Sequence, residues 1–147
     1  MDKVSAFEIL LVEDNADDEE LILYALAKSN LANSIRIAHD GAEALEILFA
    51  EGKATYPKLV LLDLKLPKVD GLEVLRQLKS HPQTRTIPVI VISSSRAEQD
   101  LVRSYQLNAN GYVIKPIDFA QLAEAVQQLG IFWLLVNQPP QHPISTF

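Results

Sequence analysis

Cysteine is absent from the 147-residue chain, and so are long apolar runs and clusters of basic residues. Without cysteine, the chain cannot form a disulfide framework, a thiolate zinc site or a cysteine nucleophile. No apolar stretch approaches the roughly 18 residues that a membrane-spanning helix requires. The first five residues also lack the charged, apolar and small segments of a signal peptide. We therefore expect a cytoplasmic protein that does not bind membranes.

Basic residues number 13 against 19 acidic ones, which gives a net charge of −6. Nucleic acid is not expected as a partner, because phosphate binding requires a basic face. No Gly-rich loop ending in Gly-Lys-Ser or Gly-Lys-Thr is present, which excludes a P-loop NTPase. The three histidines are scattered along the chain, and we expect them at the surface rather than in a metal cluster: His39, His81 and His142.

Short apolar runs alternate with segments of helical periodicity, which predicts an α/β fold. Five strands are predicted at Phe7–Val12, Ser34–Ala38, Leu59–Leu62, Pro88–Ile92 and Gly111–Ile114. Five helices are predicted at Ala16–Ser29, Gly41–Ala50, Gly71–Ser80, Ala97–Leu107 and Asp118–Leu129, the last capped by Asp118. Continuous apolar character favours strands buried on both faces of a parallel sheet. We expect a doubly wound, flavodoxin-like sheet with strand order 2-1-3-4-5, whose ligand crevice lies beside the first strand.

Carboxylates follow two of the predicted strands. Asp63 ends the run Leu59–Leu62, and Glu13 and Asp14 follow the first strand. Because these strand ends meet at one sheet edge, the three carboxylates would repel one another unless a cation joined them. A hard divalent cation, Mg²⁺ or Mn²⁺, suits such an oxygen site, and the backbone carbonyl of Lys65 is a further candidate ligand. The alternative is that Glu13 and Asp14 only begin a loop and cap the following helix.

A hydroxyl and an ammonium group stand at the ends of two other strands. Ser93 ends the fourth strand, after the run Val89–Ile92, and Lys115 follows the fifth. Beside Asp63 they would stabilise the charge of a transferred phosphoryl group, with the Asp63 carboxylate as its acceptor. Taken singly, Ser93 is equally typical of a turn and Lys115 of a solvated charge. An aspartyl-phosphate phosphatase is disfavoured, because Lys65 stands where its second aspartate is required. A flavodoxin-like electron carrier is possible on fold alone, but the sequence has no phosphate-binding loop after the first strand.

The chain resembles response-regulator receiver domains, the CheY-like superfamily, over nearly its whole length. The resemblance rests on Ile9–Asp14, on Asp63 with Pro67 and Gly71, on Pro88–Ser93, and on Tyr112 with Lys115 and Pro116, whose peptide bond is usually cis in the family. It implies that a histidine kinase phosphorylates Asp63, that Ser93 and Tyr112 act as switch residues, and that the fourth helix, fifth strand and fifth helix carry the signal. It implies a signalling protein rather than an enzyme. The alternative for Tyr112 is that it is only a half-buried aromatic side chain on an edge strand. The alternative for the whole protein is an adaptor that acts without phosphorylation.

The C-terminal segment is the second informative region. We predict a receiver domain over residues 1–136 with an extended last helix, followed by a Pro-rich tail over 137–147. The stretch Ile131–Val136 is apolar all round, which favours burial against a partner. We expect a symmetric homodimer that includes Phe132 and Trp133; folding back over its own core is the alternative. This ending also resembles small cyanobacterial receivers paired with phytochrome kinases, which implies a light-sensing kinase.

Overall fold

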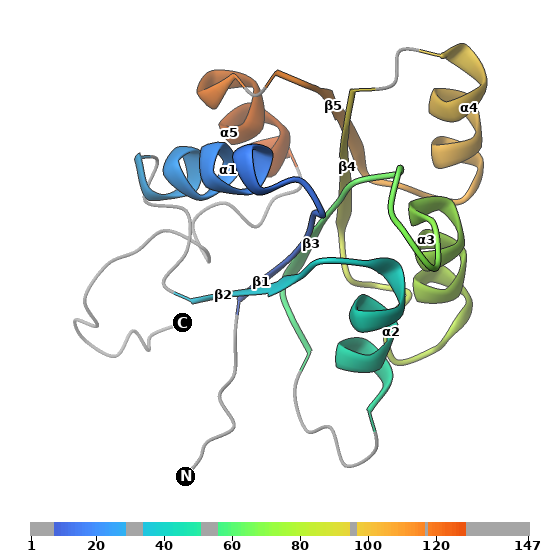
Figure 1. Ribbon diagram of the computed structural model, residues 1–147. Coiled ribbons are helices and arrows are strands. Elements are labelled where there is room, and N and C mark those ends of the chain that lie inside the picture. Colours follow the sequence, from blue (N-terminus) through green and yellow to red (C-terminus); the bar gives the residue numbers. More distant parts are fainter. Residues whose placement is uncertain (1–7, 29–33, 51–55, 95–96, 117, 129–147) are drawn as a thin grey trace, which may run out of the picture.

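The computed structural model describes residues 8–28, 34–50, 56–94, 97–116 and 118–128 (Figure 1). Strands and helices alternate along these residues, as the sequence predicts. In chain order they are β1 (Ile9–Val12), α1 (Ala16–Lys28), β2 (Ile35–Ala38), α2 (Gly41–Phe49), β3 (Leu59–Leu62), α3 (Gly71–Ser80), β4 (Val89–Ser93), α4 (Glu98–Gln106), β5 (Gly111–Ile114) and α5 (Phe119–Gln128).

The five strands form one parallel sheet with the order β2-β1-β3-β4-β5, which confirms the predicted topology. β1 and β3 are neighbours, and their last residues, Val12 and Leu62, are paired in register. Leu62 is also paired with Val91 of β4. The residues that follow β1 and β3 therefore emerge side by side from the middle of the sheet.

Helices cover both faces of the sheet, with α1 and α5 on one face and α2, α3 and α4 on the other (Figure 1). Successive residues of each strand alternate between these faces. In β1, Ile9 and Leu11 pack in the apolar cluster that contains side chains of α1 and α5. Leu10 and Val12 pack in the cluster that contains side chains of α2 and α3. Both faces are buried, which explains why the strands are continuously apolar.

Aspartates begin three of the helices. Asp40 accepts a hydrogen bond from the backbone N–H of Glu43 at 2.7 Å, and Asp70 accepts one from Glu73 at 3.1 Å. Asp118 accepts hydrogen bonds from the first turn of α5, which confirms the predicted cap. Each bond satisfies a backbone donor that has no partner within the helix.

Gly71 lets α3 begin directly against the segment that carries Asp63. A Cβ atom at Gly71 would overlap the backbone oxygen of Asp63 and lie 2.5 Å from the Cα of Leu64. The backbone N–H of Gly71 also donates to the oxygen of Leu64 at 2.8 Å. Close approach therefore requires glycine at this position.

Several predicted bounds differ by one or two residues. β4 is shifted to Val89–Ser93, because Pro88 has no N–H for the ladder, and Ser93 is paired with Ile114. Glu8 precedes β1 rather than belonging to it. α2 ends before Ala50, and α4 is one residue shorter at each end than predicted. The predictions for Phe7, Ser29, Leu129, Ile131–Val136, Phe132, Trp133 and residues 137–147 lie outside the described residues. Within the described part of the chain, no helix is long and apolar enough to cross a membrane.

Candidate functional site

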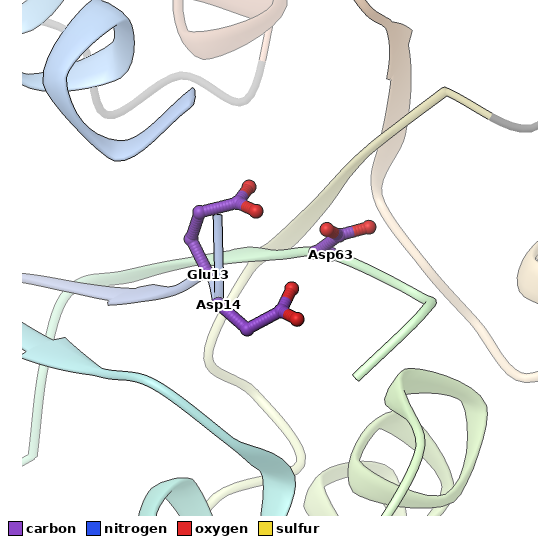
Figure 2. Close-up of side chains that lie close together, drawn as sticks. All are labelled: Glu13, Asp14 and Asp63. Carbon is purple, nitrogen blue, oxygen red and sulfur yellow. The ribbon is translucent and has the colours of Figure 1, made fainter. Parts of the chain in front are cut away.

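Three carboxylates meet where β1 and β3 end (Figure 2). Glu13 and Asp14 directly follow β1, and Asp63 directly follows β3. One oxygen from each lies within 4.8 Å of the others. Glu13 and Asp63 are only 1% and 6% exposed, whereas Asp14 is open to solvent. The in-register pairing of two central strands thus concentrates negative charge at one edge of the sheet.

The three carboxylates of Glu13, Asp14 and Asp63 together form a site that suits a divalent cation. Burial raises the pKa of Glu13 to about 7; the nearby Asp63 adds to the effect, and Lys115 opposes it. A hard cation would relieve the repulsion, and three carboxylate oxygens with one open side suit Mg²⁺ or Mn²⁺. The backbone N–H of Lys65 donates to Asp63 Oδ1 at 3.3 Å. The role of the Lys65 carbonyl as a ligand stays a prediction.

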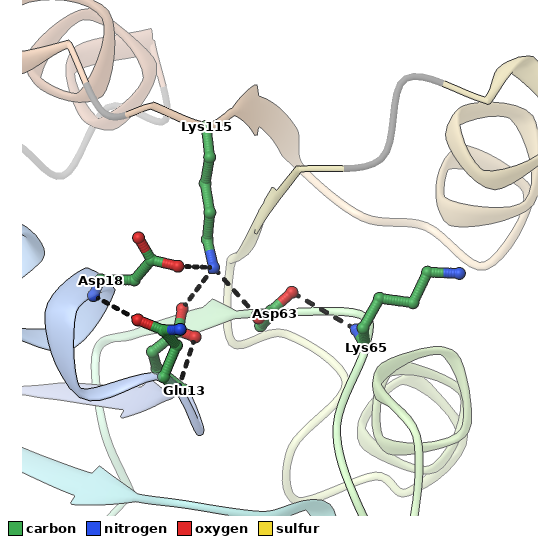
Figure 3. A network of polar contacts seen from close by, with 6 residues as sticks. Glu13, Asp18, Asp63, Lys65 and Lys115 are labelled. Atoms are coloured by element: carbon green, nitrogen blue, oxygen red, sulfur yellow. Dashed lines mark hydrogen bonds and ion pairs between the residues drawn. The ribbon is translucent and has the colours of Figure 1, made fainter.

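Lys115 places its ammonium group among carboxylates (Figure 3). Its Nζ lies 3.1 Å from Asp63 Oδ2, 2.9 Å from Glu13 Oε1 and 2.8 Å from Asp18 Oδ2. Burial disfavours the charge, but the hydrogen bonds that Lys115 donates to Asp18 and Glu13, together with the negative charge of Asp63, outweigh this effect and hold the pKa of Lys115 above its ordinary value. The side chain is 9% exposed, so the solvated-charge alternative is wrong. The Lys115–Pro116 peptide bond is cis.

Asp18 is the residue that sequence reasoning missed. Asp18 lies in the acidic first turn of α1, where acidic side chains are common for reasons unrelated to a site. The available signal was its position four residues after Asp14, on a helix that begins at the end of β1. Asn15 is the residue that caps this helix, since its Oδ1 accepts from the backbone N–H of Asp18 at 2.9 Å. Glu13 instead accepts from the N–H of Asn15 at 3.2 Å.

Ser93 and Tyr112 lie on the strands beyond Asp63. Ser93 is fully buried and is the last residue of β4, the strand that pairs directly with β3. Tyr112 lies on the edge strand β5, half-buried, and packs against the core cluster of α2 and α3. These positions are compatible with a switch pair and equally with a buried serine and an edge aromatic. Their roles stay predictions.

A hollow of about 380 Å³ adjoins the carboxylates on the Asp14 side. At its border, Lys65 Nζ lies 3.9 Å from Asp100 Oδ2 of α4. The hollow offers room for a small ligand next to the acidic group. It is lined by Asp14, Leu64, Lys65, Leu66, Pro67, Asp70, Leu72 and Asp100.

A family model for the response regulator receiver domain matches residues 9–127. Among proteins similar in sequence, the chain is 42% identical over 136 residues to the probable methanogenesis regulatory protein FilR2 of Methanothrix harundinacea, covering 91% of this chain and 88% of that one. It is 40% identical over 129 residues to response regulator Rcp1 of Synechocystis sp., covering 86% and 88% of the two chains.

Solved structures show the same similarity. The bacteriophytochrome response regulator AtBRR is 51% identical, with a TM-score of 0.78 over 92% of this chain and all of that one. The phosphorylated cyanobacterial phytochrome response regulator RcpA is 41% identical, with a TM-score of 0.73 over 93% of this chain and all of that one. Rcp1, in a Mn²⁺-bound form, is 37% identical with a TM-score of 0.73 over 92% and 100%.

Proposed function

The chain belongs to the response regulator receiver domain family, and we propose that it is a single-domain response regulator whose Asp63 accepts a phosphoryl group from a histidine kinase. The contact of Lys115 with Asp63, at 3.1 Å beside Glu13 and Asp14, is the observation that carries the proposal. The phosphorylated state of the relative RcpA supports it further.

In the proposed transfer, an oxygen of Asp63 attacks the phosphorus atom of a phosphohistidine. A bond from that oxygen to phosphorus forms, the bond from phosphorus to the histidine nitrogen breaks, and the nitrogen keeps the electron pair. Lys115 donates to the phosphoryl oxygens, and the Ser93 hydroxyl is proposed as a second donor. A divalent cation held by Glu13, Asp14 and Asp63 would neutralise negative charge on the transferred group.

Incubation with Mg²⁺ and acetyl phosphate tests this function. The wild-type protein is expected to gain the mass of one phosphoryl group, and Asp63→Asn is expected to gain none. Asp17→Asn is the matched control, because it removes an exposed carboxylate from the nearby first turn of α1. Labelling of Asp63→Asn would show that a residue other than Asp63 accepts the phosphoryl group. A wild-type protein that no donor labels would favour a phosphorylation-independent adaptor.

A phytochrome-type, light-sensing histidine kinase is the proposed donor, acting in the cytoplasm. The support is that AtBRR and RcpA, at 51% and 41% identity, are phytochrome response regulators. FilR2, at 42% identity, has a different named role. Phosphotransfer from a phytochrome kinase that is faster than from unrelated histidine kinases would support this pairing, and equal rates would contradict it.

The proposed output is a symmetric homodimer through α4, β5 and α5. Three large apolar side chains of α4, namely Leu101, Val102 and Tyr105, are 38%, 44% and 49% exposed. Exposed apolar side chains gathered on one helix are typical of an interaction surface. Phe132 and Trp133 are proposed to extend this interface.

A further inference from the structure

The ammonium group of Lys115 has three hydrogens and contacts three carboxylates. Asp18 Oδ2 is the nearest acceptor, at 2.8 Å, followed by Glu13 and Asp63 at 2.9 and 3.1 Å. These partners come from different parts of the fold, since Glu13 and Asp63 follow central strands and Asp18 belongs to α1 (Figure 3). Every donor of the ammonium is therefore matched by a charged acceptor.

The three carboxylates differ in what the proposed reaction does to them. Glu13 and Asp63 belong to the group of oxygens that fits a divalent cation, and Asp63 is also the proposed phosphoryl acceptor. Both would have to share their oxygens with the cation or the phosphoryl group. Asp18 lies outside that group, so its oxygens stay available to Lys115 at every stage.

Asp18 is also well placed to act as a fixed anchor. Its backbone N–H donates to Asn15 Oδ1 at 2.9 Å, which holds this residue in the first turn of α1. Its side chain is 30% exposed, whereas that of Lys115 is 9% exposed. The contact is thus largely shielded from water on the Lys115 side, where a charged hydrogen bond is stronger than at the surface.

We propose that Asp18 is a positioning residue that keeps Lys115 directed at Asp63 while the cation and the phosphoryl group occupy the other two carboxylates. This inference rests on the proposed phosphorylation of Asp63. Its effect is greatest in the loaded site, because Lys115 then has the fewest other fixed partners.

Asp18→Asn tests the role, with Asp17→Asn as the matched control for the loss of one charge in the same helical turn. With acetyl phosphate and Mg²⁺, Asp18→Asn is expected to be phosphorylated about three- to tenfold more slowly, since the negative charge that faces Lys115 in a partly buried pair is lost and the remaining amide oxygen is a weaker acceptor. Asp17→Asn is expected to keep the wild-type rate within about twofold. Asp18→Glu, which preserves the charge, is expected to recover part of the rate.

The side-chain ¹⁵N signal of Lys115 gives a readout that a general structural role would not move. With Mg²⁺ and beryllofluoride, a phosphoryl mimic, the ammonium signal is expected to persist in the wild type and in Asp17→Asn. In Asp18→Asn it is expected to broaden through faster exchange with water. Asp18→Ser gives the same comparison if the asparagine variant folds poorly.

An unchanged rate together with an unchanged Lys115 signal in Asp18→Asn would overturn the inference, and so would equal losses in Asp17→Asn. Failure of the proposed function gives a different result. In that case the wild type itself is not phosphorylated, while the Lys115 signal in the Mg²⁺-bound protein still reports whether Asp18 holds the ammonium group.

Discussion

Glu13 is the most buried of the three carboxylates, at 1% exposure, and it contacts the Lys115 ammonium that also contacts Asp63. Burial raises its pKa from 4.5 to about 7, and Asp63 adds to this, although the hydrogen bond to Lys115 opposes it. The folded protein therefore binds a proton at Glu13 more tightly than the unfolded chain does. Ionisation of this carboxyl group opposes folding unless a cation compensates for it.

The free energy of unfolding is thus expected to fall as the pH rises from about 4.5 to about 7 in the absence of divalent cations. Protonated Glu13 contributes fully to the free energy of unfolding below pH 4.5, the pKa of this group in the unfolded chain. The contribution is lost as the pH rises through about 7, the pKa in the folded protein, and the change is of order 1–3 kcal/mol. Glu13→Gln cannot ionise and is expected to lose this part of the pH dependence. Urea unfolding in EDTA across this pH range provides the measurement.

Two other groups with shifted pKa values, Glu73 and Lys115, do not titrate in this pH range. Hydrogen bonds from Arg76 and Gln77 lower the pKa of Glu73 to about 2, so its contribution is lost only in acid, below the range of interest. Lys115 has a pKa above its ordinary value and stays charged throughout. Equal slopes in the wild type and Glu13→Gln would contradict the assignment to Glu13.

The central residues of the site could be predicted because they follow strands. In a parallel sheet all carboxyl ends lie at one edge, so Asp63, Glu13 and Lys115 had to emerge together once the strands were identified. Asp18 could not be found in this way. Its position four residues after Asp14 places it near this edge, but its contact with Lys115 also depends on the position of α1 against the sheet, which that spacing does not specify.

At the scale of elements, α3 shows how tightly a helix can be placed against the site. Its first residue, Gly71, contacts the backbone of Asp63 and Leu64 so closely that a Cβ atom would overlap both. Gly111, the first residue of β5, is different, because a Cβ atom there would meet Ile90 Cγ1 at an ordinary 3.5 Å. Gly111 therefore serves as the control position for a substitution of Gly71 by alanine.

Gly71→Ala is expected to destabilise the protein by about 1–3 kcal/mol, because α3 must move away from the Asp63 segment. Gly111→Ala is expected to change stability by less than about 1 kcal/mol, since its site has space for the methyl group. Chemical denaturation of both variants provides the comparison. Equal costs would show that close approach is not the reason for glycine at position 71.

The existence and order of the elements followed from hydrophobic periodicity, whereas their ends did not. The strand predicted to end at Ile92 continues to Ser93, which is the last residue of β4 and pairs with Ile114. The apolar pattern ends at Ile92, but the hydrogen-bonded ladder continues for one more residue. Strand ends are set by pairing with neighbours, which apolar character alone does not report.

At the scale of the whole molecule, β5 is an edge strand of the sheet, and α4 lies beside it with exposed apolar side chains. β5 pairs with β4 on one side only, so its other side adjoins the proposed interface. An exposed sheet edge with neighbouring apolar surface is a favourable place for a second copy to bind.

Sedimentation velocity over a range of concentrations, with and without acetyl phosphate, tests the dimer. The wild type is expected to associate as the concentration rises, and Val102→Glu on α4 is expected to weaken association at least about tenfold by placing a charge in the interface. Leu21→Glu, a similarly exposed position on α1, which does not belong to the proposed interface, serves as the control. Monomers alone under every condition would contradict the homodimer.

The parallel order of the strands also determines where the chain can change in length during evolution. Each connection from a helix to the next strand joins the sheet at the edge away from Asp63, as in the turn from α3 to β4. Insertions and deletions there leave the carboxylates in place. A deletion of one residue within β3 would instead turn its following carboxylate to the opposite face. We therefore expect homologues to vary in length at the edge of the sheet away from Asp63 more than within the strands that carry the carboxylates.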